Sequence, residues 1–471
     1  MRFATIILLG SLLSGTVLTA SAQEAETPRL SLNQCLAIAL AKSPTVKVAD
    51  MEVQRLDYSK KEVIGQLLPT VDFGANYNRM LAKQVMYMNM DALGSLPGAG
   101  GDSDESTSQK SSGKKDGIKM GLDNSYSMGF SATLPLIAPQ LWKSIGVSEA
   151  QILRSSELAA QSRQQLVNQV KSAYYTLLLA IDSRKTIAES YEMATLTHNI
   201  YTGRYEAGAA SDYEVLRTSV AMQNIEPELL AADVAIKKAR LQLAIVMGID
   251  ATFNFDPATS LDSYEAGMLA HTRQLSADYS NNADLRILDL DNDILRRNIK
   301  IQKLAFSPTL AFTANYNWTS MSNGSPFKNF NWNPYSQIGL TLSIPILQGG
   351  RRVQKIKEAQ IQAEQLAEQR INLERSVAMQ VSLAIDNINI NVRQIGSCRR
   401  SVEEAERAHN IMVQSFDIGA ASYLDLRDSE LSLTRARLAY YQAIYNYLIA
   451  DSELELLQGN APINEYQAVQ Y

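Results

Sequence analysis

Two ten-residue segments of the chain alternate apolar and polar side chains and nearly repeat each other. They read PTVDFGANYN from Pro69 and PTLAFTANYN from Pro308, and they match at seven of ten positions. Successive side chains of a β-strand point to opposite faces, so strict alternation predicts an amphipathic strand. The apolar face would carry Val71, Phe73 and Tyr77 in the first copy and Leu310, Phe312 and Tyr316 in the second. The polar asparagines at positions 76, 78, 315 and 317 would occupy the opposite face.

Each copy is followed by a second alternating segment, YSMGFSATLP or SQIGLTLSIP. The chain is therefore predicted to form four strands in two hairpins. The segment Gly94–Gly121, rich in Gly, Ser, Asp and Lys, would be a flexible exposed loop of the first hairpin. A shorter turn-rich segment, Met321–Asn333, would join the second hairpin.

The remaining sequence predicts unusually long helices. No proline occurs between Pro139 and Ala207, or between about Arg351 and Ile418. At 1.5 Å per residue, each run would extend to about 100 Å as a helix. Mean helices in globular proteins have only about 11 or 12 residues, so an elongated, repetitive body is expected.

Both long helices lead into a similar short motif, EAGAASDYEVL in the first half and DIGAASYLDL in the second. Gly208 and Gly419 suit the left-handed residue that ends a helix. Ser211 and Ser422 suit the N-cap of a returning helix. Each long helix is thus predicted to turn back in a tight helical hairpin.

The order helix, strand, strand, long helix, tip, helix occurs twice. The N-terminus, with Arg2, an apolar run and the small residues Ala20-Ser21-Ala22, is typical of a secretory signal peptide. The predicted organisation is a signal peptide over residues 1–22, a first repeat over 23–248, a linker over 249–276, a second repeat over 277–459 and a C-terminal tail over 460–471. The first repeat would hold strands at about 69–80 and 124–135 and a helical hairpin at about 138–247. The second would hold strands at about 308–320 and 335–345 and a helical hairpin at about 349–457.

Composition narrows the function classes. A net charge of −5 with dispersed signs does not indicate nucleic-acid binding. No nucleophile, base and orienting group assemble in the sequence, so an enzyme is not expected. The three histidines, His198, His271 and His409, have no second ligand at metal spacing and are predicted to be ordinary surface residues. No metal or cofactor is predicted.

Two other residue types, methionine and cysteine, are candidates for special chemistry. Met86, Met88 and Met90 have strand spacing, which is compatible with a soft metal, but apolar packing at a strand end or loop is favoured. Cys35 lies about 34 residues before Pro69 and Cys398 about 53 residues after Pro345. If both helices run down from the strand ends, these spacings give about 50 and 80 Å. The two thiols are therefore predicted to be unpaired and buried.

After the signal peptide, the sequence has no run of about 18 apolar residues, so no membrane-spanning helix is expected. Strands of about ten residues do match a tilted bilayer crossing, and known membrane barrels need at least eight strands. Four strands per chain would close only by assembly of several copies. Two, three or four copies would give eight, twelve or sixteen strands, and these physical considerations leave the choice open.

Several motifs, in order and in both repeats, resemble those of the TolC-like outer-membrane efflux proteins. They are the opening helix LSLNQCLAIALAKSPTVKVA, the two P-T-x-x-x-x-x-N-Y strands, the proline-ended second strands, the G-A-A-S tips and the closing YNYLIADSELELLQG. The resemblance covers about residues 30 to 459. It implies a homotrimer with a twelve-stranded barrel among outer-membrane lipids and a periplasmic α-helical barrel. It also implies a passive duct that receives substrates from an inner-membrane pump through a periplasmic adaptor protein. The long Gly94–Gly121 loop departs from the family pattern.

The resemblance also assigns candidate site residues. The family narrows its periplasmic entrance with acidic residues just beyond the second tip, which here are Asp425 and Asp428. Spaced i, i+3 they share a helical face, so three copies would stack two carboxylate rings that favour cations. A structural alternative is that Asp425, and its first-repeat counterpart Glu214, only cap their helices.

The hairpin tips are the second candidate site, because in the family they meet the adaptor. The alternative is that they are merely good turns. The tip residues are Gly208, Ala209, Ala210 and Ser211 in the first repeat and Gly419, Ala420, Ala421 and Ser422 in the second. The competing function is a soluble periplasmic coiled-coil scaffold whose strands form a small sandwich and whose helices bind partners.

Overall fold

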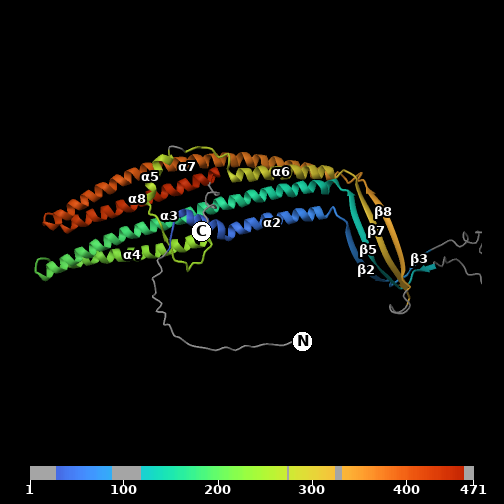
Figure 1. Ribbon diagram of the computed structural model, residues 1–471, viewed down its shortest axis with the longest axis horizontal. Helices are drawn as coiled ribbons and strands as arrows, with labels where there is room; N and C mark the ends of the chain where they lie inside the picture. Colours follow the sequence, from blue (N-terminus) through green and yellow to red (C-terminus); the bar gives the residue numbers. More distant parts are fainter. Residues whose placement is uncertain (1–27, 87–117, 273–274, 324–330, 461–471) are drawn as a thin grey trace, which may run out of the picture. The chain divides into compact units, whose positions relative to one another are not determined.

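The computed structural model describes residues 28–86, 118–272, 275–323 and 331–460 (Figure 1). The predicted signal peptide, most of the Gly94–Gly121 loop, Met88, Met90 and nearly all of the C-terminal tail lie outside the described residues. The chain divides into two compact units, each assembled from parts of both repeats. Of the described residues, one unit takes those within 28–47, 160–282 and 376–460, and the other takes those within 48–159 and 283–375.

The second of these units contains the sheet. It comprises most of α2 (Pro44–Gly65), β2 (Thr70–Arg79), β3 (Gln84–Met86), β4 (Ile118–Met120), β5 (Asn124–Ile137), the first part of α3 (Pro139–Glu206), α6 (Ala283–Leu304), β7 (Thr309–Ser322), β8 (Asn333–Ser343) and the first part of α7 (Arg351–Asp417). Four long strands pair antiparallel in the order β2-β5-β7-β8. Strands β2 and β8 are therefore the two edges of this sheet.

The register places the apolar side chains of all four strands on one face. Phe73 of β2 lies opposite Phe130 of β5, which lies opposite Tyr316 of β7. Further along, Phe312 of β7 lies opposite Leu340 of β8. The Phe73 and Phe130 rings are 5.1 Å apart. Phe73 and Leu340 nevertheless remain 58% and 66% exposed, so this apolar face is uncovered in the single chain.

The first hairpin contains more pairing than the sequence analysis expected. Strand β4, which falls inside the segment predicted to be a flexible loop, pairs antiparallel with β3. Nearby, the Asn323 side chain accepts hydrogen bonds from the Lys83 ammonium and the Asp123 backbone at 3.2 and 2.9 Å. The ends of the two hairpins are thereby tied to each other.

The other unit is helical. It contains β1 (Arg29–Leu30), α1 (Leu32–Lys42), the rest of α3, α4 (Asp212–Met247), β6 (Asp256–Pro257), α5 (Asp262–Thr272), the rest of α7 and α8 (Tyr423–Gln458). The 68-residue α3 continues through a tip into α4, and the 67-residue α7 continues into α8. Its fully buried side chains include Tyr174, Leu243 and Tyr447. In the described part of the chain, no helix is long and apolar enough to cross a membrane.

The opening helix is interrupted, because Ser43 ends α1 and Pro44 starts α2. Proline lacks a backbone N–H and is favoured in the first turn of a helix. Cys35 of α1 is fully buried and unpaired, and burial raises the pKa of its thiol to about 12. Cys398 is also unpaired but only half-buried. The prediction of free thiols is confirmed, whereas burial holds for Cys35 alone.

The segment predicted as a linker, 249–276, contains ordered elements. Strand β6 pairs parallel with β1, and α5 packs on the helices of the same unit. The buried Asp182 carboxylate of α3 accepts the Leu261 N–H at 3.1 Å, just before α5 begins. Tyr440 of α8 donates to Glu265 of α5 at 2.8 Å. These partners are distant in sequence, so local sequence patterns do not indicate the docking.

The two returning helices end at equivalent close contacts. Gly248 and Gly459 both have left-handed φ angles, 69° and 70°, after α4 and α8. A Cβ at Gly248 would lie 3.1 Å from the Lys42 carbonyl oxygen. A Cβ at Gly459 would lie 2.8 Å from the carbonyl carbon of Asn281 and closer still to its oxygen. The neighbouring Asn282 donates from its side chain to the Leu457 carbonyl at 2.8 Å, which fixes this junction.

Substituting Gly459 with alanine is expected to destabilise the helical unit by roughly 2 kcal/mol or more, through left-handed strain plus overpacking against Asn281. Gly419→Ala is the matched control, because Gly419 has φ 75° with no atom near its Cβ position. It should cost only the strain, about 1 kcal/mol. Urea unfolding of the purified protein, followed by circular dichroism, measures both. Equal shifts in the two unfolding midpoints would show that the contact with Asn281 does not affect stability.

Candidate functional site: the hairpin tips and the adjacent cleft

Each hairpin tip contains a left-handed glycine followed by a capped helix. Gly208 and Gly419 have φ angles of 72° and 75°. Ser211 and Ser422 are the N-caps of α4 and α8, and both form complete capping boxes. In the residues predicted as tips, only Ala210 and Ala421 are partly buried, and the other six are exposed. The tips therefore present small side chains and backbone to solvent.

The two acidic residues of the predicted gate have different surroundings. The Asp425 carboxylate accepts the Ser422 N–H at 3.1 Å and its hydroxyl at 2.7 Å. Glu214 makes the equivalent bonds to Ser211 at 2.8 and 2.9 Å. These hydrogen bonds lower the pKa of both carboxyl groups. The capping alternative is thus realised in the structure for Asp425 and Glu214.

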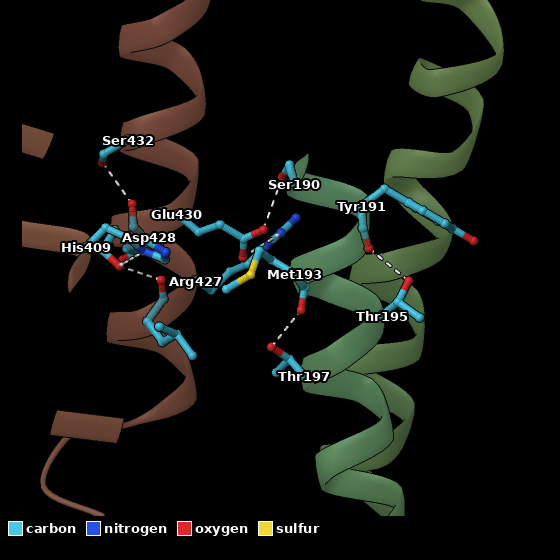
Figure 2. Close-up of polar contacts among 12 residues, drawn as sticks. Ser190, Tyr191, Met193, Thr195, Thr197, His409, Arg427, Asp428, Glu430 and Ser432 are labelled. Carbon is cyan, nitrogen blue, oxygen red and sulfur yellow. Dashed lines mark hydrogen bonds and ion pairs between the residues drawn. The ribbon is translucent and has the colours of Figure 1, made fainter. Parts of the chain in front are cut away.

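Asp428 lies one turn further along α8 and takes no part in the capping box. Its side chain is exposed, and its backbone carbonyl accepts the Ser432 hydroxyl at 2.8 Å (Figure 2). Asp425 and Asp428 lie close together on α8, as their spacing predicts. The carboxylate of Asp428 is consequently available for interactions outside its own helix.

The two tips pack against each other through an aromatic cluster. Tyr201 of α3 contacts Phe416 of α7 and Tyr423 of α8, with ring centroids 6.1 and 5.7 Å apart. The Arg204 guanidinium covers the Tyr201 and Phe416 rings at 5.5 and 5.3 Å. Arg217 of α4 covers the Tyr423 ring at 5.3 Å. Figure 1 shows both tips at the same end of the helical unit.

A cavity of about 480 Å³ lies between α3, α7 and α8, behind the tips. We call it the α3–α8 cleft. It is lined by Thr186, Glu189, Ser190, Glu192 and Met193 of α3, Glu406, His409 and Asn410 of α7, and Glu430, Leu433, Thr434 and Arg437 of α8. Most of these side chains are polar or charged, so the cavity is suited to hold water.

Two polar networks, one centred on Glu430 and one on Arg437, cross the cleft. Glu430, only 8% exposed, accepts the Ser190 hydroxyl at 3.1 Å and pairs with Arg427 of its own helix at 3.4 Å (Figure 2). Arg437 of α8 pairs with Glu189 of α3 at 2.5 Å and with Glu406 of α7 at 2.7 Å. Helix α8 is therefore held to its neighbours by directed polar contacts.

The prediction that the histidines are surface residues is wrong for His409. Its side chain is 9% exposed, and Nδ1 lies 3.2 Å from the Ser429 hydroxyl. His198 is half-buried, with Nδ1 3.1 Å from the Thr218 hydroxyl. Each histidine thus faces a hydroxyl 20 residues further on, across its own tip. The equal His-to-hydroxyl spacing in both repeats is the sequence signal of this arrangement.

Within the described parts of the chain, no three His, Cys, Asp or Glu side chains converge as a metal site would require. The side chain of His271 and that of Met86 are not among those described.

The sequence matches the model of the outer membrane efflux protein family over residues 35–249 and 275–460. Among curated relatives, the outer membrane protein TolC of Escherichia coli K12 is 23% identical over 375 residues, covering 74% of this chain and 75% of that protein. These matches confirm the resemblance and the predicted efflux function, and they do not favour the soluble scaffold.

Solved structures show the same fold. The outer membrane protein VceC of Vibrio cholerae superposes with a TM-score of 0.66 at 16% identity, covering 91% of this chain and 96% of that one. The outer membrane channel CmeC of Campylobacter jejuni gives 0.66 at 16% identity, covering 98% and 96%. The predicted fold class and outer-membrane location are confirmed by this agreement and by the family match. Because that match spans both repeats, the chain belongs to the outer membrane efflux protein family.

Proposed function

We propose that this protein is the passive outer-membrane duct of a tripartite system, fed by an inner-membrane pump through a periplasmic adaptor. The observation that carries the proposal is the sheet with one uncovered apolar face and two open edges. An exposed apolar face of this extent is unfavourable in water and favourable against lipid. The opposite face, with Asn76 and Asn315 among its residues, is polar enough to line an aqueous lumen.

The strand directions support assembly from identical copies. Because β2, β5, β7 and β8 alternate in direction, β8 of one copy can pair antiparallel with β2 of the next. Such a head-to-tail contact closes into a ring when the rotation per copy is right. Three copies, the number that the resemblance implies, give a twelve-stranded barrel without exposed edges.

The acidic residues of α8 form the proposed periplasmic gate. Three copies of Asp425 and Asp428 would give two stacked rings of carboxylates, which repel one another and attract cations. The observed capping role of Asp425 is compatible with this, because hydrogen bonds from Ser422 keep the carboxylate charged. Asp428 is exposed and lies outside the capping box, so it would contribute more than Asp425 to the negative potential in the lumen. Glu214 is the counterpart of Asp425 in the first repeat, and it caps α4.

The exposed tips are the proposed contact with the adaptor. Residues 208–211 and 419–422 offer small side chains on rigid turns, a surface that another helical hairpin can approach closely. The aromatic cluster behind them fixes both turns as one unit. The two repeats, 23–248 and 277–459, would in this arrangement supply equivalent hairpins around the tube.

The proposal is tested with the purified protein. Outer-membrane extracts should contain a heat-modifiable species of three subunits, and that species should form channels in planar bilayers. Release of the protein by osmotic shock, with no channel activity, would instead support the soluble scaffold. Co-purification with a pump and an adaptor from the native membrane then tests the tripartite assignment separately.

A further inference from the structure

The α3–α8 cleft contains a histidine and a buried carboxylate that capping, lipid contact and the proposed gate do not use. Glu430 is more than nine-tenths buried and bridges two helices through the Ser190 hydroxyl. Figure 2 shows this side chain extending from α8 toward α3. A buried carboxylate is stable there only while its hydrogen-bond and ion-pair partners remain in place.

His409 of α7 lines the same cavity and packs beside α8 through Ser429. Charged groups face the cavity from all three helices. They are Glu189 and Glu192 of α3, Glu406 of α7, and Glu430 and Arg437 of α8. Arg437 is already paired with Glu189 and Glu406, and Arg427 with Glu430. A charge on the His409 ring would therefore enter a site in which Glu189, Glu406 and Glu430 already have arginine partners.

Burial lowers the pKa of His409, with Glu430 raising it and Arg437 lowering it further as smaller effects. The ring is thus neutral at pH 7. An imidazole that is hydrated in an opened cleft would have an ordinary pKa near 6.5. Protons bind more tightly to the state with the higher pKa, so acidification favours the opened cleft.

The free energy of unfolding should depend on pH in the same direction, because acidification disfavours the closed, folded state. A histidine whose pKa is lowered in the folded state contributes stability that is present above the unfolded value of about 6.5. That contribution is lost as pH falls below about 6.5 and through the lowered folded value. The expected window of response therefore lies below pH 6.5.

We propose that His409 and Glu430 form a proton-sensitive switch, in which protonation of His409 loosens the contact of α8 with α3 at Ser190. This inference rests on the proposed function for its consequence, since Asp428 lies on α8 two residues before Glu430. Loosening α8 moves the acidic residues of the proposed gate. The duct would then open more readily on the acid side than at neutral pH.

The test compares the wild-type trimer with His409→Gln at pH 7.5 and 5.5, using hydrogen exchange of α8 residues 423–437. Exchange times are scaled for the intrinsic pH dependence of amide exchange. His198→Gln is the matched control, because His198 faces a hydroxyl across the other tip. Protection of α8 in the wild type should fall on acidification, and His198→Gln should behave likewise. His409→Gln should remove this response.

A second variant guards against a folding defect in His409→Gln. Glu430→Gln retains an acceptor for Ser190 but removes the charge that favours protonation of His409. Its response should therefore move to lower pH than in the wild type. A wild type without an α8 response, a His409→Gln protein that responds normally, or an unshifted Glu430→Gln protein would each overturn the switch.

Planar-bilayer recordings on the same samples separate the two proposals. Channels that form at pH 7.5 support the duct irrespective of the switch. A pH response of α8 in a protein that forms no channels would support the switch and contradict the duct.

Discussion

Replacing Asp425 and Asp428 together with alanine is expected to raise single-channel conductance several-fold and to weaken block by a trivalent cation at least about tenfold. The physical reason is the loss of the two stacked carboxylate rings proposed for the gate, since each close charge contact is worth about 1 kcal/mol even in water. Cations held by the proposed rings would also obstruct the entrance, so loss of the rings would raise conductance. Recordings in planar bilayers, with the blocker added from the periplasmic side, measure both effects.

Controls separate charge from capping at this site. Asp425→Asn removes the charge but retains an acceptor for the Ser422 N–H, so it should reproduce only the smaller part of the loss of block, without loss of the cap. Glu214→Gln makes the same change in the first repeat's capping box and should leave block unchanged. Asp428→Asn alone should account for most of the effect. Unaltered conductance and block in the double variant would remove both residues from the gate.

Gly129→Ala is expected to destabilise the sheet by about 1–3 kcal/mol per subunit through overpacking and to reduce the yield of assembled protein. A Cβ at Gly129 would lie 2.5 Å from the Tyr316 carbonyl oxygen and 2.8 Å from the Asn317 Cα. Strands β5 and β7 would have to separate at the centre of the sheet. The measurement is the temperature at which the heat-modifiable species is lost on electrophoresis.

Gly74→Ala provides a matched control on the neighbouring strand. Gly74 lies directly opposite Gly129 in the β2–β5 pair, but a Cβ there would meet no atom within 4 Å. This variant should assemble with wild-type heat resistance. If both alanine variants assemble equally well, the close approach of β5 and β7 does not contribute to the stability of the sheet.

The sequence predicts the features of this protein that depend on neighbouring residues. Alternation in PTVDFGANYN and PTLAFTANYN is a local consequence of strand geometry, and these segments lie in β2 and β7. The tips were also predictable, because a left-handed glycine and a serine N-cap act within a few residues. The capping role of Asp425 is seen only in the structure, and its gate role stays a prediction, because both roles use the same carboxylate.

Features that join distant segments were not predictable from one sequence. The contact of Glu430 with Ser190 spans 240 residues, and that of Gly459 with Asn281 depends on how two chain segments meet. The docking of α5 through Asp182 and Tyr440 likewise depends on tertiary packing. His409 was misassigned because a lone histidine has no local pattern that distinguishes burial from exposure.

The aromatic cluster at the tips reveals how the two halves of the chain have diverged. Arg217 of α4, the positional counterpart of Asp428 of α8, is engaged over the ring of Tyr423. At this position the first hairpin carries a cation that packs on an aromatic ring of the second hairpin. The second hairpin carries an exposed carboxylate there. In a ring of three chains, the mouth therefore has three-fold rather than six-fold symmetry. Three of the six hairpins would then present a carboxylate at this position, and the other three an arginine packed on a ring.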